Sequence, residues 1–199
     1  SKGHSYSLSF SANRVTARWK VNVGAYGNRR ANDFAIDETT TVKSKTSSWE
    51  YNGLVVKSAG PKWSAGITAG ASHSSFSNTD RQFSLAPGIE YDFFPYSESS
   101  RRSLAIRYTA GPVPYEYAEL TVFDKMSETI PKHFLNVSLG LRQPWGQLNV
   151  NTNFSQQLNH VDRYRAAVFG ETHVRLFKGF SFNMFARYER ILDQISLRK

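Results

Sequence analysis

The stretch Gly146–Leu158, GQLNVNTNFSQQL, alternates between two kinds of side chain with a period of two. One face of an extended chain would carry Leu148, Val150, Thr152 and Phe154, and the other would carry Gln147, Asn149, Asn151, Asn153 and Ser155. Successive side chains of a strand point to opposite faces, so this pattern predicts a β-strand with one apolar and one polar face. Whether the apolar face turns inward to a core or outward to lipid decides the class of protein.

The same alternation recurs along the chain, and no stretch of useful length has helical spacing. It predicts strands around residues 6–12, 15–26, 47–58, 63–72, 83–93, 103–110, 134–142, 147–155, 165–177 and 180–189. Most of these exceed the roughly five or six residues typical of strands in globular sheets. We therefore expect one all-β domain over residues 1–199, with about ten antiparallel strands. For residues 47–58 the pattern leaves open which side chains share a face.

The connections between these strands are of two kinds. Short turns rich in turn-forming residues are expected at 11–16, 58–63, 95–102, 142–146 and 177–179. Longer or more polar connections are expected at 29–47, 76–81, 112–132 and 158–164, with residues 37–48 extending a hairpin on the loop side. This strict alternation is typical of an up-and-down meander, and transmembrane barrels have the same asymmetry between their two rims.

The composition of the two faces indicates which one meets lipid. The polar face is dominated by Ser, Gly, Asn, Thr and Gln, whereas a soluble barrel exposes many Lys and Glu side chains. The apolar face is aliphatic at mid-strand and has aromatic residues near the strand ends: Trp19, Trp63, Tyr91, Phe93, Trp145, Phe177, Phe180 and Tyr188. Aromatic girdles of this kind lie at the two membrane interfaces. We therefore predict that the apolar face turns outward, as in an up-and-down transmembrane β-barrel.

The overall composition narrows the possible functions. The net charge is +9, and a basic excess of this size can serve nucleic acid or an anionic membrane surface. Lys and Arg are scattered, with doublets such as Arg29-Arg30 but no dense run, so no nucleic-acid partner is predicted. The absence of cysteine excludes disulfides, thiol catalysis and Cys-based zinc sites, and it is compatible with an oxidising periplasm.

Hydropathy does not argue against a membrane protein of this kind. No stretch approaches the roughly eighteen apolar residues of a membrane helix. The mean hydropathy of −0.48 fits a barrel, because barrel strands present only alternate residues to lipid. Residues 1–10 lack the basic-then-apolar run of a signal peptide, so an exported protein would carry this chain in its mature part.

The turns and strands resemble those of bacterial outer-membrane β-barrel proteins, and more narrowly an uncharacterised group of them. The resemblance rests on SANRVTARWKVNV (11–23), YNGLVVKSAGPKWSAG (51–66), FSLAPGIEYDFFPYSESSRRSLAIRY (83–108), LRQPWGQLNV (141–150) and RLFKGFSFNMFARYERILDQISL (175–197). It implies a fold, an outer-membrane location, and lipids and lipopolysaccharide as partners. It implies no reaction and no cofactor.

The chain departs from the usual pattern of these barrels at both ends. Such barrels commonly finish with a strand that ends in an aromatic residue, and both termini lie on the short-turn side. Here the last predicted strand runs toward the long loops and is followed by SLRK, and residue 1 also falls on the loop side. We expect a fragment, a re-engineered barrel, or a barrel whose missing strands come from a partner chain. An even count of about ten strands could also close on itself.

Charged residues on the predicted inward face are the candidates for a functional interior. They are Arg18, Lys20, Glu90, Asp92, Arg107, Arg142, Arg165, Glu171, His173, Arg175, Arg187 and Glu189. One hypothesis is a positive pore lining that favours small anions. The other is a network of internal salt bridges, with cross-strand pairs between the last two strands, that fills a narrow lumen. The small lumen expected for about ten strands favours the network.

The leading functional hypothesis is a non-enzymatic narrow pore or structural scaffold in the outer membrane. One alternative is a soluble barrel that holds an apolar ligand. Another is a hydrolase on the extracellular rim, for which His160 and Asp162 in a predicted loop are the candidate pair. No nucleophile, phosphate-loop or metal-ligand motif supports catalysis, and no metal is predicted.

Basic residues on the loop side form a last candidate site. They are Arg29, Arg30, Lys43, Lys45, Lys132 and Arg163. They could contact anionic lipid headgroups or polysaccharide phosphates, or they could form a solvated rim.

Overall fold

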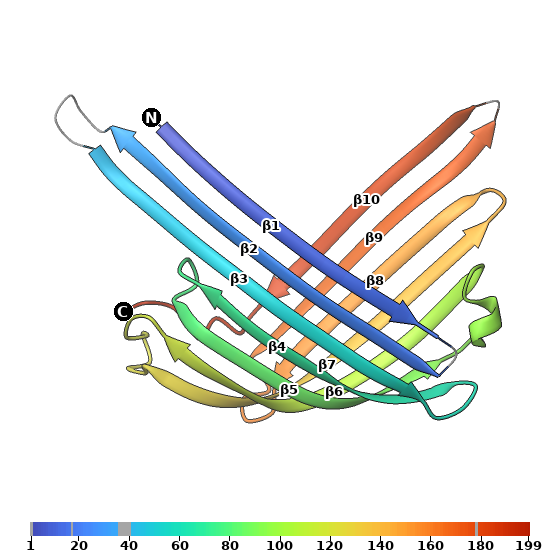
Figure 1. The fold of residues 1–199 in the computed structure, drawn as a ribbon, viewed down its shortest axis with the longest axis horizontal. Helices are drawn as coiled ribbons and strands as arrows, with labels where there is room; N and C mark the ends of the chain where they lie inside the picture. Colours follow the sequence, from blue (N-terminus) through green and yellow to red (C-terminus); the bar gives the residue numbers. More distant parts are fainter. Residues whose placement is uncertain (1, 17, 36–40, 178) are drawn as a thin grey trace.

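A single sheet of ten antiparallel strands makes up the fold (Figure 1). The computed structural model describes residues 2–16, 18–35, 41–177 and 179–199. The strands are β1 (Lys2–Val15), β2 (Trp19–Ala35), β3 (Thr41–Ser58), β4 (Trp63–Ser74), β5 (Thr79–Asp92), β6 (Arg102–Tyr117), β7 (Ser127–Gln143), β8 (Gly146–Gln157), β9 (Tyr164–Phe177) and β10 (Phe180–Ile191). Each strand pairs with the next along the chain, which confirms the predicted all-β, up-and-down arrangement.

One short 3-10 helix, η1 (Tyr96–Glu98), lies between β5 and β6. Across the described residues, no helix is long and apolar enough to cross a membrane.

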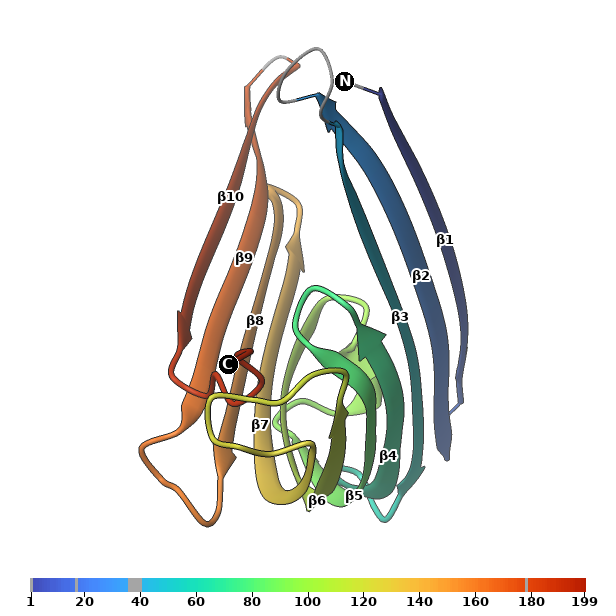
Figure 2. The same ribbon diagram turned by 90° about the vertical axis from the view of Figure 1, so that its left-hand side faces the viewer.

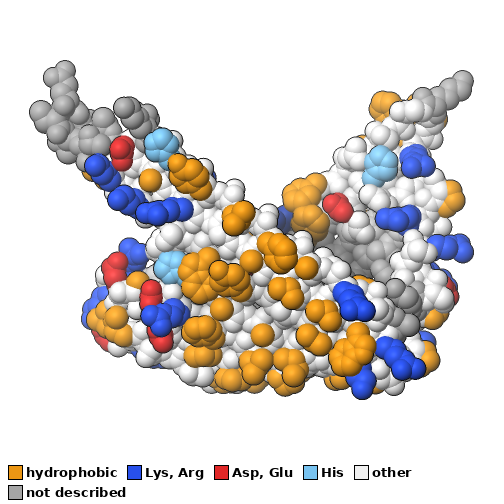
Figure 3. Space-filling view, viewed as in Figure 1, with side chains coloured by type: hydrophobic (Ala, Val, Ile, Leu, Met, Phe, Trp, Pro, Cys, Tyr) orange, Lys and Arg blue, Asp and Glu red, His pale blue; other side chains and the backbone are white. Residues whose placement is uncertain are grey.

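The side chains of the strands are segregated in the sense opposite to that of a water-soluble protein. Along β4 and β5, exposed and less exposed residues alternate, and the exposed ones are mainly apolar. Ile67 is 52% exposed and Leu85 is 59% exposed, whereas Thr68 faces the concave side of the sheet. Figure 3 shows hydrophobic side chains over the middle of the outer face, with Lys and Arg mainly toward the ends of the strands. The apolar face therefore lies outside, as the sequence pattern predicts.

The sheet curves into a trough that stays open between its first and last strands (Figure 2). β1–β3 form one wall, β8–β10 form the other, and β4–β7 form the floor. No pairing joins β1 to β10 among the described residues, so the closed barrel expected from the sequence is not formed. The strands of the two walls slope in opposite directions, and the two free edges therefore diverge instead of running side by side (Figure 1).

The connections correct the prediction that short and long ones alternate strictly. The turn rim, where β1 leads into β2, also carries the extended connection 93–101 with η1. The opposite loop rim includes the tight connection 75–78. Much of the predicted loops 29–47 and 112–132 is strand, because the backbone pairing of β2 with β3 and of β6 with β7 continues into both segments. The predictions for Ala17, residues 36–40 and Lys178 lie outside the described residues.

Glycines allow neighbouring strands to approach closely on the inner face of the floor. Gly66 of β4 lies opposite Gly88 of β5, and Gly88 lies opposite Thr109 of β6. A Cβ atom at Gly88 would lie 2.5 Å from the carbonyl oxygen of Tyr108 and would also meet the Thr109 side chain. A Cβ atom at Gly53 on the outer side would meet only one atom, at 3.9 Å.

We predict that Gly88→Val destabilises the fold and that Gly53→Val does not. Overpacking of a close-packed position typically costs about 1–3 kcal/mol. Thermal unfolding of the two variants, followed by circular dichroism in detergent, measures the difference. Equal midpoints for the two variants would contradict the close approach of β5 and β6.

Candidate functional site

The concave face of the trough is lined by neutral polar side chains. A cavity of about 700 Å³ lies along it and takes its lining from strands β1 to β8. Asn22, Asn52, Thr68 and Asn136 are among the residues that line it. The cross-strand registers place these residues on one face, because odd positions of β1 and even positions of β2 to β5 pair with one another. Among the described residues, the interior of the trough is therefore polar along most of its length, and its apolar cluster lies at the loop end.

Amide side chains on β7 and β8 bond mainly to one another. Asn136 Nδ2 donates to Oδ1 of Asn153 at 2.9 Å and to Oδ1 of Asn151 at 3.2 Å. Asn153 Nδ2 in turn donates to Asn151 Oδ1 at 2.7 Å. This network holds the wall of the cavity in place without adding charge.

A buried ion pair joins β5 to β6 near the turn rim. Glu90 is 5% exposed and accepts two hydrogen bonds from Arg107, from Nε at 2.8 Å and from Nη2 at 2.5 Å. Lys20 Nζ lies 3.6 Å from the other carboxylate oxygen. The cluster links β2, β5 and β6 across the inner face, and one carboxylate serves two cations.

A second ion cluster lies on β9 and β10. The Glu189 carboxylate forms ion pairs with two arginines, with Nη2 of Arg165 at 2.6 Å and Nη2 of Arg187 at 2.9 Å. On the same face, Glu171 accepts a hydrogen bond from Asn149 at 2.8 Å, and His173 Nδ1 lies 2.6 Å from Asn183 Oδ1. An ion pair between the last two strands is therefore present for Arg165 and Glu189, whereas the described residues form none from Glu171, His173 or Arg175, on which the predicted pairing rests.

The structure thus divides the charged candidates into two groups. Ion pairs bring together Lys20, Glu90 and Arg107, and separately Arg165, Arg187 and Glu189. Within the described part of the chain, no ion pair involves Arg18, Asp92, Arg142, Glu171, His173 or Arg175. Arg18 and Asp92 line a second cavity of about 610 Å³ at the turn rim. Arg142 and Arg175 lie near the same end of β7 and β9, which leaves that end of the concave face positive.

Most of the aromatic candidates gather at the turn rim. Trp63 and Tyr91 lie with ring centres 4.8 Å apart, and Phe93 follows 5.0 Å from Tyr91. Along the same rim lie Trp19, Trp145, Phe177 and Phe180. All of these are exposed except Tyr91, which is half-buried. Tyr188 is the exception in position, because it lies toward the loop end of β10.

A second set of outward aromatic residues, which the sequence reasoning missed, lies on the loop side. The ring centres of Trp49 and Tyr51 on β3 lie 5.4 Å apart, and those of Phe154 on β8 and Tyr164 on β9 lie 5.9 Å apart. These residues share the outward parity of their strands. The pattern of residues 47–58 leaves the face of Trp49 and Tyr51 open, and Tyr164 precedes the predicted strand 165–177, so only Phe154 was placed on the apolar face.

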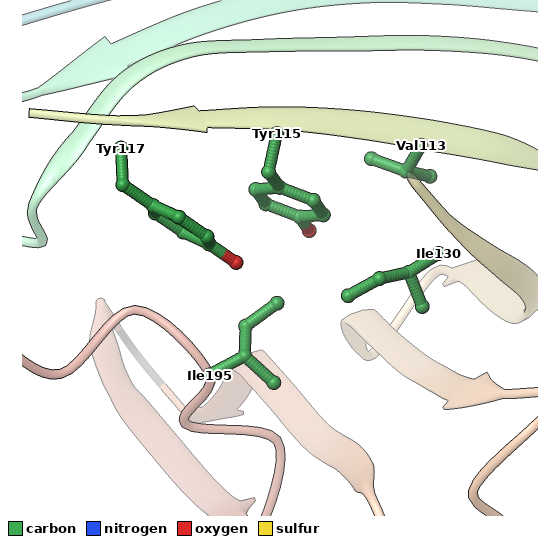
Figure 4. Close-up of a cluster of buried hydrophobic side chains, with 5 residues drawn as sticks. All are labelled: Val113, Tyr115, Tyr117, Ile130 and Ile195. Atoms are coloured by element: carbon green, nitrogen blue, oxygen red, sulfur yellow. The ribbon is translucent and has the colours of Figure 1, made fainter. Parts of the chain in front are cut away.

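The segment 192–199 folds back over the loop end of the concave face (Figure 2). Figure 4 shows Ile195 pointing toward Tyr115, Tyr117, Val113 and Ile130, and Ile195 is only 4% exposed. Backbone hydrogen bonds fix the segment to the β6–β7 connection, from Val122 N to Leu197 O at 2.9 Å and from Lys199 N to Leu120 O at 3.0 Å. The sequence reasoning missed this cluster because it treated residues 112–132 as a loop, although Val113, Tyr115 and Tyr117 alternate there.

Lys132 corrects the prediction of a basic loop rim. It is buried on the inner face, where Nζ donates to the Tyr115 hydroxyl at 3.0 Å and lies 3.4 Å from Asp193. It cannot meet lipid headgroups, because its position on β7 shares the inward parity of Ile130. The other basic candidates on this rim, Arg29, Arg30, Lys43 and Lys45, are exposed, and Arg163 lies 5.0 Å over the ring of Phe123.

The candidate catalytic pair lies in the connection between β8 and β9. His160 and Asp162 are both exposed, and in the portion described no hydrogen bond or ion pair joins their side chains. The described residues also hold no group of three or more side chains that could bind a metal ion.

Comparison with known proteins gives one match. The model of a family described as "Protein of unknown function, DUF481" matches residues 1–191. No curated protein matches the chain, and no solved structure matches it. The family description names no activity.

We predict that Glu90→Gln destabilises the fold by about 3 kcal/mol, the lower end of the cost of breaking a buried pair. The Arg107 guanidinium then remains on the inner face of the sheet without the Glu90 carboxylate that pairs with it. Urea unfolding of the detergent-folded chain measures the loss. Glu116→Gln is the matched control, because its contact with Arg81 is exposed and should cost less than about 1 kcal/mol.

The double variant Glu90→Gln with Arg107→Met should recover much of that loss, since it removes the buried carboxylate together with the partly buried guanidinium that pairs with it. A Glu90 variant no less stable than the Glu116 control would show that the cluster does not hold β5 to β6.

We predict that Ile195→Ala loosens the segment 192–199 by about 2 kcal/mol or more, the lower end for removing a buried isoleucine side chain. The amides of Val122 and Lys199 should then exchange with solvent about thirtyfold faster, because their hydrogen bonds belong to this segment. Leu197→Ala is the control, because Leu197 is half-exposed and outside the cluster. Unchanged exchange in the Ile195 variant would contradict anchoring by this side chain.

Proposed function

The chain belongs to this family of unknown function, and we propose that it is a β-barrel protein of the bacterial outer membrane whose narrow polar interior passes small solutes. One observation carries the proposal: the apolar face of the sheet is exposed on the convex side, while the polar face lines the concave side. In water this arrangement would leave a broad apolar surface without a partner, whereas in a bilayer that surface meets hydrocarbon.

The length of the apolar surface supports a bilayer as its surroundings. On β4 the outward positions run from Trp63 through alanines and Ile67 to His73. About ten residues at about 3.3 Å each, tilted by about 40° from the membrane normal, span about 25 Å. This matches the height of the apolar band of outer-membrane barrels, and the aromatic row at the turn rim would lie at one interface.

The two ends of the molecule fit the two surfaces of that membrane. Arg29, Lys43 and Lys45 are exposed toward the loop end of β2 and β3. They would face lipid headgroups or the phosphates of lipopolysaccharide, which attract basic side chains. The turn rim, with its short connections, would face the periplasm.

The interior supports a narrow passage in preference to a wide channel. The concave cavities carry polar and charged side chains among apolar ones, and together they run from the turn rim into the middle of the trough. The segment 192–199 occupies the loop end and narrows it. Arg18, Arg142 and Arg175 at the turn rim would favour small anions, since rings of arginine select in that direction.

Planar-bilayer conductance of the detergent-purified chain is the direct test. Steady steps with preference for chloride over potassium in asymmetric salt would support the passage. A silent chain that still shows heat-modifiable migration on a gel would contradict the passage and leave a structural scaffold. A chain that stays in solution without detergent would contradict the membrane proposal and favour a soluble ligand-binding protein.

We predict that Leu85→Lys impairs membrane insertion and that Ser84→Lys does not. Neighbouring positions on β5 point to opposite faces, and a lysine on the lipid face near the bilayer centre costs about 2–4 kcal/mol. Ser84 lines the polar cavity, which has room for the longer side chain. The fraction of each variant that becomes heat-modifiable in lipid vesicles gives the comparison, and equal fractions would contradict a lipid-facing Leu85.

A further inference from the structure

Two free strand edges remain in the sheet, and they are incompatible with the interior of a membrane. Every described strand from β2 to β9 pairs on both sides, whereas β1 and β10 each pair on one side. Unpaired backbone groups in hydrocarbon cost several kcal/mol each, so open edges are not found there. We infer that β1 and β10 of the same chain join in the membrane, with Tyr6 opposite Tyr188 and Phe10 opposite Met184. The inference rests on the proposed function.

The direction and the faces of the two strands permit this join. Each strand is antiparallel to the next, so the first and last of ten strands run in opposite directions. Odd-numbered residues of β1 and of β10 both belong to the concave face. The outer apolar band stays continuous only when odd-numbered residues of β1 lie opposite odd-numbered residues of β10. Every register that sets odd residues opposite even ones is therefore excluded.

The side chains across the proposed seam are complementary on both faces. On the outer face, Leu8 would lie opposite Ala186, between the Tyr6–Tyr188 and Phe10–Met184 pairs. On the inner face, the small residues Ser5, Ser7 and Ser9 would lie opposite the larger Glu189, Arg187 and Phe185. Phe185 is now 64% exposed although it points toward the concave side, so it has room to be covered.

The stagger of the whole sheet, combined with this register, determines the shear of the closed barrel. Starting from Val15, consecutive partners across the sheet are Lys20, Val56, Gly66, Gly88, Thr109, Phe134, Ser155, Arg165 and Ile191. The path thus begins at the turn end of β1 and finishes at the loop end of β10. In the proposed seam Val15 would lie opposite Gly179. One circuit of the sheet that starts at Val15 ends at Ile191, which is 12 residues further along than Gly179, and this offset of 12 residues is the shear of the barrel.

This shear gives a barrel of ordinary geometry. With ten strands, about 3.3 Å per residue and about 4.8 Å between strands, a shear of 12 gives a tilt of about 40°. Membrane barrels have tilts of about 35–45°. The same register pairs every residue of β10 with a residue of β1, whereas a shift by two residues in either direction leaves one end of β10 unpaired.

Disulfide cross-linking tests the seam directly, because the chain has no cysteine of its own. The variant Leu8→Cys with Ala186→Cys should form an intramolecular bond in lipid vesicles. It should form at least several times faster than in the two shifted controls, Leu8→Cys with Met184→Cys and Leu8→Cys with Tyr188→Cys. The single-cysteine variants show whether each substitution alone permits insertion.

The possible outcomes separate the seam from the proposed function. Bonds between two copies, seen as a dimer band, would overturn the seam and indicate that a second chain fills the gap. Insertion without an intramolecular bond in any of the three pairs would also overturn it, and a faster bond in a shifted control would overturn this register. Failure of the unmodified chain to enter vesicles would overturn the proposed function, together with the reason for joining the edges.

Discussion

Backbone hydrogen bonding between neighbouring strands fixes which side chains share a face of the sheet. The pairing is continuous enough that one path of partners runs from Val15 across all ten strands to Ile191. A slip by one residue between any two strands would turn the apolar residues of the next strand inward. The close approach at Gly66 and Gly88 on the floor helps to hold this register, because larger side chains would not fit there.

The inner face combines neutral amides with a few ion pairs, and this combination suits a hydrated interior. Glu90 holds cations from β2 and β6, and Glu189 holds cations from β9 and β10. Each carboxylate therefore joins strands in addition to neutralising charge. Between these clusters, Asn136, Asn151 and Asn153 bond to one another and leave little net charge in the middle of the wall. The positive excess is left at the turn rim, where Arg18, Arg142 and Arg175 have no ion-pair partner within the described residues.

Period-two alternation was sufficient to predict the number of strands, their order and the outward apolar face. It failed where side chains on both faces become polar, as at the ends of β2 and β3, because the backbone pairing there continues without a hydrophobic signal. It also predicts a rim position for Lys132, because the pattern indicates a loop at 112–132, whereas β7 begins at Ser127 and turns Lys132 inward. The burial of Ile195 depends on a fold-back contact between residues far apart in sequence, which no local pattern records. The sequence predicts that charged residues on the inner face form ion pairs, but it does not predict which residues pair, since the partners depend on the register of each strand pair.

The segment 192–199 connects the width of the trough at its loop end to the position of the last strand. It continues directly from β10, and Leu192 N donates to Tyr164 O at 2.8 Å before Ile195 reaches the β6–β7 cluster. The loop end of β10 is therefore tied to β9 and, through the segment, to the floor of the trough. The residues of β10 that would join β1 are 180–191, which precede the segment, so the seam and the fold-back use separate backbone groups. Closure of the wall and narrowing of the mouth can consequently occur together, and loosening Ile195 should widen the mouth while the joined edges stay paired.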